Sequence, residues 1–192
     1  MLGAAIQLFA AKGFQSTSIA DILQKAGAHY GSLYHYFPTK QHVLLAVLEA
    51  YRDGIEAMLL MPAWNGLSDP IEKIFALLAS YRRALVSSDC LYGCPIGSLA
   101  LELHEPDPAV RELLAVNFNG WVGHVQSCLA AAASRLPKKT DLRQLAVFVL
   151  SVMEGGVMQA RTHRDVSSFD DSVAALRNYF SHLLKTARRE KS

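Results

Sequence analysis

The sequence predicts an all-α protein with two domains, a small N-terminal domain over residues 1–45 and a larger helical domain over residues 46–192. Apolar residues recur at spacings of three and four, which is typical of amphipathic helices, and no stretch alternates apolar and polar residues over the length of a strand. Of the 192 residues, 51% are apolar and 19% are charged, which supports a sizeable core and excludes a disordered chain. About nine helices are expected.

The first two expected helices each end at a glycine. One covers residues 2–12, and Gly13 can stop it in a left-handed conformation. The other covers residues 19–26, because a capping-box sequence begins at Ser18 and Gly27 follows two turns later. The second helix is therefore followed by a tight turn.

A third short helix is expected over residues 30–36, where Leu33 and Phe37 would anchor it to the helix before it. Two short helices joined by a tight glycine turn, with a supporting first helix, form a helix-turn-helix unit. The second helix of such a unit enters the major groove of DNA. The sequence therefore predicts a DNA-binding N-terminal domain.

The larger domain begins with helices that carry recognisable start and stop signals. A helix from about residue 40 is expected to end at Pro62, since proline interrupts a helix interior. Asp69 and Pro70 have the residue types of an N-cap and a first helical residue. Residues 87–98 interrupt the helical pattern and are expected to be largely irregular.

Three further helices complete the predicted domain. Asp107 and Pro108 repeat the start signal, and Pro137 closes the long helix behind them. Thr140 can cap the next helix and Ser168 the last one.

The N-terminal motif resembles a known family. GFQSTSIADILQKAG followed by GSLYHYFPTKQHVLLAVL is similar, without a gap from about residue 4 to residue 50, to the DNA-binding domain of the tetracycline-repressor (TetR) family. CPIGSLALEL and MEGGVMQARTH look similar to one branch of this family that includes drug-resistance regulators. The resemblance implies a homodimer that binds a palindromic operator in double-stranded DNA and releases it when a small ligand enters the C-terminal domain.

The resemblance also implies roles for individual residues. Gly31 would let the backbone approach DNA, and Tyr30 and His35 would contact base edges. Tyr34, Tyr36 and Lys40 would lie over phosphates, and Ser18 could do the same. Residues 1–50 carry three lysines against two acidic residues, a formal charge of only +1, and the basic segment usual before the family's first helix is not seen. The candidate DNA-binding residues are Ser18, His29, Tyr30, Gly31, Ser32, Tyr34, His35, Tyr36 and Lys40.

Apolar and aromatic stripes in the larger domain can line a cavity for a small effector. Scarce inward charge favours an apolar or aromatic effector, and flat or soft side chains such as Trp121 and Met153 suit one. The same stripes can equally be plain core. The candidate ligand-binding residues are Phe75, Leu78, Tyr81, Leu103, Phe118, Trp121, Val122, Met153 and Val157.

The last two helices, expected over residues 141–163 and 169–189, carry apolar residues on more than one face. One face can pack on the chain's own core, and the other predicts a homodimer in which four helices meet about a twofold axis. Gly155 and Gly156 could allow close approach there or mark a kink that makes room for ligand. The candidate dimerisation residues are Val149, Val152, Gly156, Val173, Leu176, Phe180 and Leu183.

Several other classes of protein are disfavoured. The chain has no apolar run long enough to span a membrane and no signal-peptide pattern at its start, and three cysteines, an odd number, predict reduced thiols in the cytoplasm. Cys90 and Cys94 lack partner histidines, so neither a metal site nor a cofactor is expected. No catalytic pattern is present, so the protein is not expected to be an enzyme.

The sequence thus predicts a ligand-responsive transcriptional regulator, with a repressor favoured. The alternative is a helical small-molecule-binding protein of the same fold with weak or lost DNA binding. A helical enzyme is the least favoured class.

Overall fold

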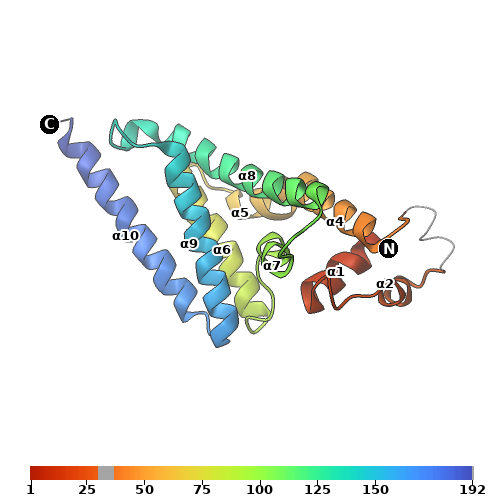
Figure 1. Ribbon diagram of the computed structural model, residues 1–192. Coiled ribbons are helices and arrows are strands. Elements are labelled where there is room, and N and C mark those ends of the chain that lie inside the picture. Colours follow the sequence, from red (N-terminus) through yellow and green to blue (C-terminus); the bar gives the residue numbers. More distant parts are fainter. Residues whose placement is uncertain (30–36, 192) are drawn as a thin grey trace. The chain divides into compact units, whose positions relative to one another are not determined.

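The computed structural model describes residues 1–29 and 37–191, and within these ranges the regular structure is helical, without a strand (Figure 1). The chain forms two compact units, and each unit is made of two segments that are separated in the sequence. Met1–Ile55 and Cys94–Phe118 make up the first unit, and Glu56–Gly93 and Asn119–Ser192 make up the second. Residues 94–118 thus pack with the N-terminal helices, and the boundary near residue 45 stays a prediction.

The first unit is built around α1 (Leu2–Lys12), which contacts α2 (Ile19–Ala26), α4 (Lys40–Ile55) and α7 (Pro95–Glu102). The expected bounds of the first two helices are confirmed. The first turns of α8 (Pro108–Ala131) also belong to this unit. Its buried side chains include Ala5, Phe9, Ile22, Leu23, Val43, Leu44, Val47, Leu48, Leu99, Val110 and Leu114.

In the second unit α9 (Leu142–His163) and α10 (Ser167–Arg189) lie side by side (Figure 1), and α6 (Pro70–Ser87) packs against both. Their core includes Phe75, Phe169 and Phe180, and the rings of Phe75 and Phe180 meet edge to face with centroids 5.4 Å apart. The remaining elements are a π-helical turn (Glu56–Leu60), α5 (Met61–Trp64), the later turns of α8 and a 3₁₀ turn (Ala133–Arg135).

Two expectations about helix bounds in the larger domain are wrong. Pro62 does not end the helix that begins at Lys40, because the chain passes through the π-helical turn and Pro62 then lies in the first turn of α5, where no backbone donor is needed. The helix α7 begins at Pro95, so the last residues of the expected irregular segment are helical.

Two predicted caps are also replaced by neighbouring residues. Asp141, not Thr140, caps α9, since its carboxylate accepts hydrogen bonds from the backbone N–H groups of Arg143 and Gln144 at 2.9 and 3.0 Å. α10 has no side-chain cap at its N-cap residue; Asp165, not Ser168, accepts the backbone N–H of Ser167. This carboxylate, two residues before the helix, accepts one of the N–H groups that lack a partner within the helix.

Candidate functional site

The α2 helix begins with a complete capping box. The Ser18 hydroxyl accepts the backbone N–H of Asp21 at 3.1 Å, and the Asp21 carboxylate accepts the backbone N–H of Ser18 at 2.7 Å. Lys12 of α1 donates to the same carboxylate at 2.8 Å, and this bond, with those from Ser18, lowers the pKa of Asp21 well below its usual range. Gly27 ends α2 in the left-handed conformation with φ of 60°. The expected start and turn of a helix-turn-helix are therefore present.

Most of the residues expected to meet DNA follow this turn. His29 is exposed directly after it. The third expected helix lies outside the described residues, and with it six candidate residues: Tyr30, Gly31, Ser32, Tyr34, His35 and Tyr36.

Lys40 begins α4 as expected, but its ammonium group binds the chain itself. Its Nζ donates to the carbonyl oxygens of Phe14 at 2.9 Å and Thr17 at 3.0 Å, and lies 4.3 Å from the centroid of the Phe14 ring. The structure therefore places Lys40 as a support for the loop before α2. The predicted contact of Lys40 with a phosphate stays a prediction.

Four of the seven candidate dimerisation residues are buried in the single chain: Val149, Gly156, Leu176 and Phe180. Two of these four, Gly156 and Leu176, also line a surface hollow between α9 and α10. Gly156 allows α10 to come close to α9, because a Cβ there would lie 3.0 Å from the Phe169 ring. Val152, Val173 and Leu183 are only partly buried. The predicted stripe thus combines core residues with residues at the edge of a surface.

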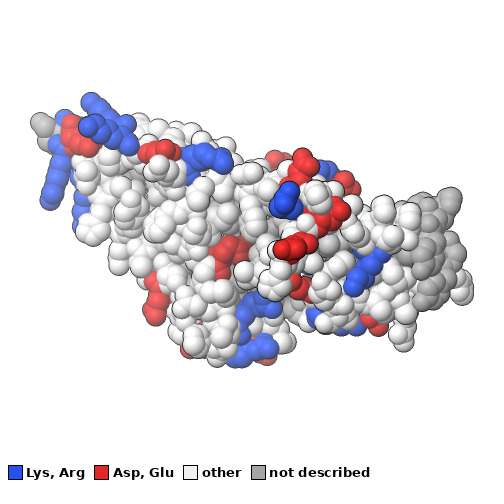
Figure 2. All heavy atoms as spheres, viewed as in Figure 1, with Lys and Arg blue, Asp and Glu red and all other residues white. Residues whose placement is uncertain are grey.

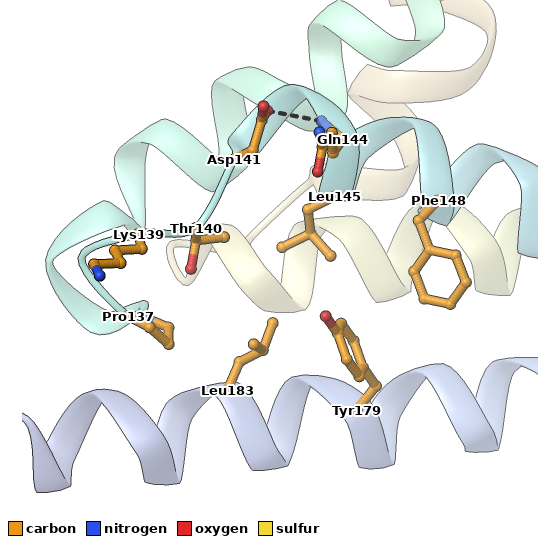
Figure 3. Close-up of a pocket in the computed structure, with 9 residues that line it drawn as sticks. All are labelled: Pro137, Lys139, Thr140, Asp141, Gln144, Leu145, Phe148, Tyr179 and Leu183. Carbon is orange, nitrogen blue, oxygen red and sulfur yellow. Dashed lines mark hydrogen bonds between the residues drawn. The ribbon is translucent and has the colours of Figure 1, made fainter.

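The exposed apolar surface of these helices centres on Phe148 of α9 and Tyr179 of α10, which are 45% and 46% exposed. Their rings meet edge to face with centroids 5.6 Å apart. They flank a groove of about 500 Å³ between the two helices, with Leu145 and Leu183 pointing toward each other inside it (Figure 3). We call this surface the α9–α10 groove; it is lined by Pro137, Lys139, Thr140, Asp141, Gln144, Leu145, Phe148, Tyr179 and Leu183.

Sequence reasoning missed Phe148 and Tyr179 because each stands next to a core residue. Phe148 precedes Val149 and Tyr179 precedes Phe180, so each is turned by one helical position away from the buried stripe. A surface of small residues continues from them along both helices: Ser151, Gly155, Ser172 and Ala175. A large aromatic side chain just outside a buried stripe is the signal that could have identified this face.

Comparison with known proteins identifies a family for the N-terminal helices and another for the C-terminal helices. Residues 1–47 match the family described as "Bacterial regulatory proteins, tetR family", and residues 70–175 match "Transcriptional regulator LmrA/YxaF-like, C-terminal domain". An uncharacterized HTH-type transcriptional regulator of Mycobacterium tuberculosis (strain CDC 1551 / Oshkosh) is 33% identical over 187 residues, which cover 93% of this chain and 91% of the relative. The chain belongs to the TetR family of bacterial transcriptional regulators.

Two other transcriptional regulators extend the comparison. The HTH-type transcriptional repressor DhaR of Mycobacterium sp. (strain GP1) is 24% identical over 166 residues, covering 85% of this chain and 82% of DhaR. A cysteine-substituted CifR, solved in complex with a 26-bp double-strand operator, has the same fold, with a TM-score of 0.75 at 23% identity over 92% of this chain and 93% of CifR. The predicted all-α fold and the regulatory, non-enzymatic role are confirmed.

The structure distributes the candidate ligand-binding residues of this TetR-family chain over both units. Leu103 and Phe118 lie in the first unit. The other seven lie in the second; Tyr81 is partly exposed and the rest are buried: Phe75, Leu78, Trp121, Val122, Met153 and Val157. Burial alone is equally expected of core residues.

Trp121 differs from its buried neighbours by one unsatisfied polar atom. It is 4% exposed, and its indole N–H has no hydrogen-bond partner in the structure. Trp64, the other tryptophan, donates its indole N–H to the carbonyl oxygen of Lys73 at 2.8 Å. Because buried N–H groups are nearly always paired, Trp121 marks a place where an acceptor is missing.

Charge is unevenly spread over the surface. Lys and Arg side chains gather around the C-terminal end of α10, whereas around α1 and α2 they are isolated (Figure 2). Within residues 1–29 and 37–191 no helix combines the length and apolar composition needed to cross a membrane. Nor do the described His, Cys, Asp and Glu residues form a group of three that could hold a metal ion.

Proposed function

We propose that this TetR-family regulator is a repressor that binds a palindromic operator as a homodimer and is released by a small apolar or aromatic effector. The observation that carries the proposal is the capped α2 followed by the left-handed turn at Gly27, which is the first half of a helix-turn-helix. The name of DhaR, a relative described as an HTH-type transcriptional repressor, supports the direction of regulation. The three cysteines are buried and form no disulfide, which is consistent with a reducing cytoplasm as the site of action.

The α9–α10 groove supports the homodimer. Phe148 and Tyr179 together present an exposed aromatic pair, and exposed apolar patches of this kind mark interaction surfaces. The small residues beside them would let two helices of a second copy approach closely, as in a four-helix bundle. Two recognition helices related by the same twofold axis would then read the two halves of a palindrome.

Alanine substitution of Tyr30 and of His35 tests the DNA-binding assignment. Each substitution is expected to weaken binding to the operator by roughly 1–3 kcal/mol, because a base contact is lost, with little change in the thermal midpoint. The measurement is a gel-shift titration with duplexes from the intergenic DNA beside the gene. Gln7→Ala, an exposed change on the supporting helix α1, is the matched control and should bind as the parent does. Parent-like affinity in both variants would contradict the groove assignment.

The alternative function, a ligand-binding protein with weak or lost DNA binding, is favoured by one observation. Lys12 and Lys40 both use their charge within the chain, on Asp21 and on loop carbonyl oxygens, which reduces the charge left for phosphates. The same titration separates the two functions. A parent protein that shifts none of the flanking duplexes would support the alternative.

The unpaired indole N–H of Trp121 supports an effector that carries a hydrogen-bond acceptor on an apolar body. We expect 2-acetonaphthone, which has a ketone oxygen, to bind several-fold more tightly than 2-isopropenylnaphthalene, which has a CH2 group in place of that oxygen and therefore a similar shape without the acceptor. Calorimetric titrations of the parent and of Trp121→Phe measure this preference, which the substitution should remove. Trp64→Phe is the matched control, because its N–H is already satisfied, and it should retain the preference. Equal affinities for the two compounds in the parent would exclude this role.

A further inference from the structure

The loop that joins α1 to α2 is held by a side chain from far along the sequence. Glu102, the last residue of α7, accepts the backbone N–H of Phe14 at 2.9 Å and that of Gln15 at 2.6 Å. One carboxylate oxygen serves each N–H, so the pair is bidentate. Charge-assisted bonds of this geometry are among the stronger hydrogen bonds in proteins.

Lys40 binds the carbonyl groups of the same loop. Backbone N–H groups of the loop thus donate to a carboxylate from α7, and its carbonyl groups accept from an ammonium group of α4. We call these two side chains, Glu102 and Lys40, the loop clamp. Together they bind the backbone of Phe14, Gln15 and Thr17, in the loop that leads directly into the capping box of α2.

The loop itself is shaped to receive the carboxylate. Gly13 has φ of 83°, and a Cβ at this position would lie 2.8 Å from a Glu102 oxygen, so a larger residue would be strained and would displace the carboxylate. Thr17, 1% exposed, donates its hydroxyl to the carbonyl oxygen of Gly13 at 2.6 Å. Both ends of the loop are therefore set by specific contacts.

We infer that Glu102 is a positioning residue for operator binding, and that α7 is part of the DNA-binding unit. This inference rests on the proposed function. Residues 70–175 match the C-terminal domain family, yet α7 within them packs on α1 and holds the loop before α2. A shift of α7 would therefore move the N-terminus of α2, and with it the turn at Gly27.

Glu102→Gln tests the inference, with Glu105→Gln as the matched control. Glutamine keeps one acceptor oxygen and loses the second, whereas Glu105 is exposed, has no hydrogen bond in the structure and lies only three residues away. Removing a carboxylate should on electrostatic grounds strengthen DNA binding, so Glu105→Gln should bind flanking duplexes as tightly as the parent or slightly more so. Glu102→Gln should bind them roughly tenfold more weakly, because two charge-assisted bonds to the loop are weakened.

Two further measurements distinguish a positioning role of Glu102 from a loss of folding in the Glu102→Gln variant. Amide exchange of Phe14 and Gln15 should accelerate in Glu102→Gln, while exchange within α4 and the thermal midpoint stay close to those of the parent. Glu102→Asp keeps the charge but is too short to reach both N–H groups, so it should show the same faster exchange and weaker binding if the glutamine variant fails to fold. Affinities are compared per active protein, measured by stoichiometric titration.

Parent-like affinity and parent-like exchange in Glu102→Gln would overturn the inference. Tighter binding in both glutamine variants would do the same, since it would show an electrostatic effect alone. A parent that binds none of the flanking duplexes would contradict the proposed function instead. In that case unchanged exchange of the Phe14 and Gln15 amides would still overturn the loop clamp.

Discussion

Replacing Phe148 and Tyr179 together by glutamate is expected to convert the proposed dimer into monomers and to abolish operator binding. Both side chains are nearly half exposed, so one chain should fold with the charges in water. In an interface the same two carboxylates would be desolvated beside their symmetry copies, at a cost of roughly 4 kcal/mol or more, about a thousandfold in association. Sedimentation equilibrium measures the first effect, and gel shift with flanking duplexes the second.

Val86→Glu is the control for this prediction. Val86 is also an exposed apolar residue, 49% accessible, but it lies on α6 outside the α9–α10 groove. This variant should remain a dimer and bind DNA as the parent does. A parent that is monomeric at micromolar concentration, or a double variant that still dimerises, would exclude the groove as the interface.

Loss of the dimer and loss of operator binding should appear together, because a monomer contacts only one half-site and makes only half of the contacts. Half-sites of a palindrome lie about 34 Å apart or a multiple of that distance, which a single recognition helix cannot span. A dimer joins two weak contacts at high effective concentration. Loss of DNA binding without loss of the dimer would therefore point to a change in the helix-turn-helix itself.

Local signals explain why so much of the fold could be predicted from the sequence. The caps at Ser18 and Asp69 and the turn at Gly27 depend on residues within three positions of each other, so a short stretch of sequence contains the whole cause. Where two polar residues stand side by side, as Thr140 and Asp141 do, the sequence does not decide which one caps the helix. In the structure the cap is Asp141, one residue after the predicted Thr140.

The parts that could not be predicted depend on contacts between distant residues. The bonds of Lys40 to the carbonyl groups of Phe14 and Thr17 could not be predicted, because these groups belong to a loop whose shape the sequence does not define. Glu102 is 88 positions from Phe14, and no periodic pattern connects them. Such contacts follow from how helices pack, and helical spacing gives the faces of a helix but not its neighbours.

In the C-terminal helices, helical periodicity could not separate the buried face from the exposed one. α9 carries apolar residues on more than one face, so periodicity alone could not say which face is core and which is surface. The prediction grouped Val149 and Phe180 with an interface, whereas both are buried within the chain. The adjacent residues Phe148 and Tyr179 are the exposed ones, one helical position away.

Phe180→Ala is accordingly expected to reduce the free energy of unfolding by about 3–5 kcal/mol, because it leaves a cavity and removes the ring contact with Phe75. Urea denaturation of the variant in the Phe148→Glu, Tyr179→Glu background measures this cost in the absence of association. In that monomer, truncation of a core residue should lower the free energy of unfolding by the full amount. Truncation of an interface residue should hardly change it. A change below about 1 kcal/mol there, with dimerisation impaired when Phe180→Ala is made alone, would return Phe180 to the interface that the helical stripe first suggested.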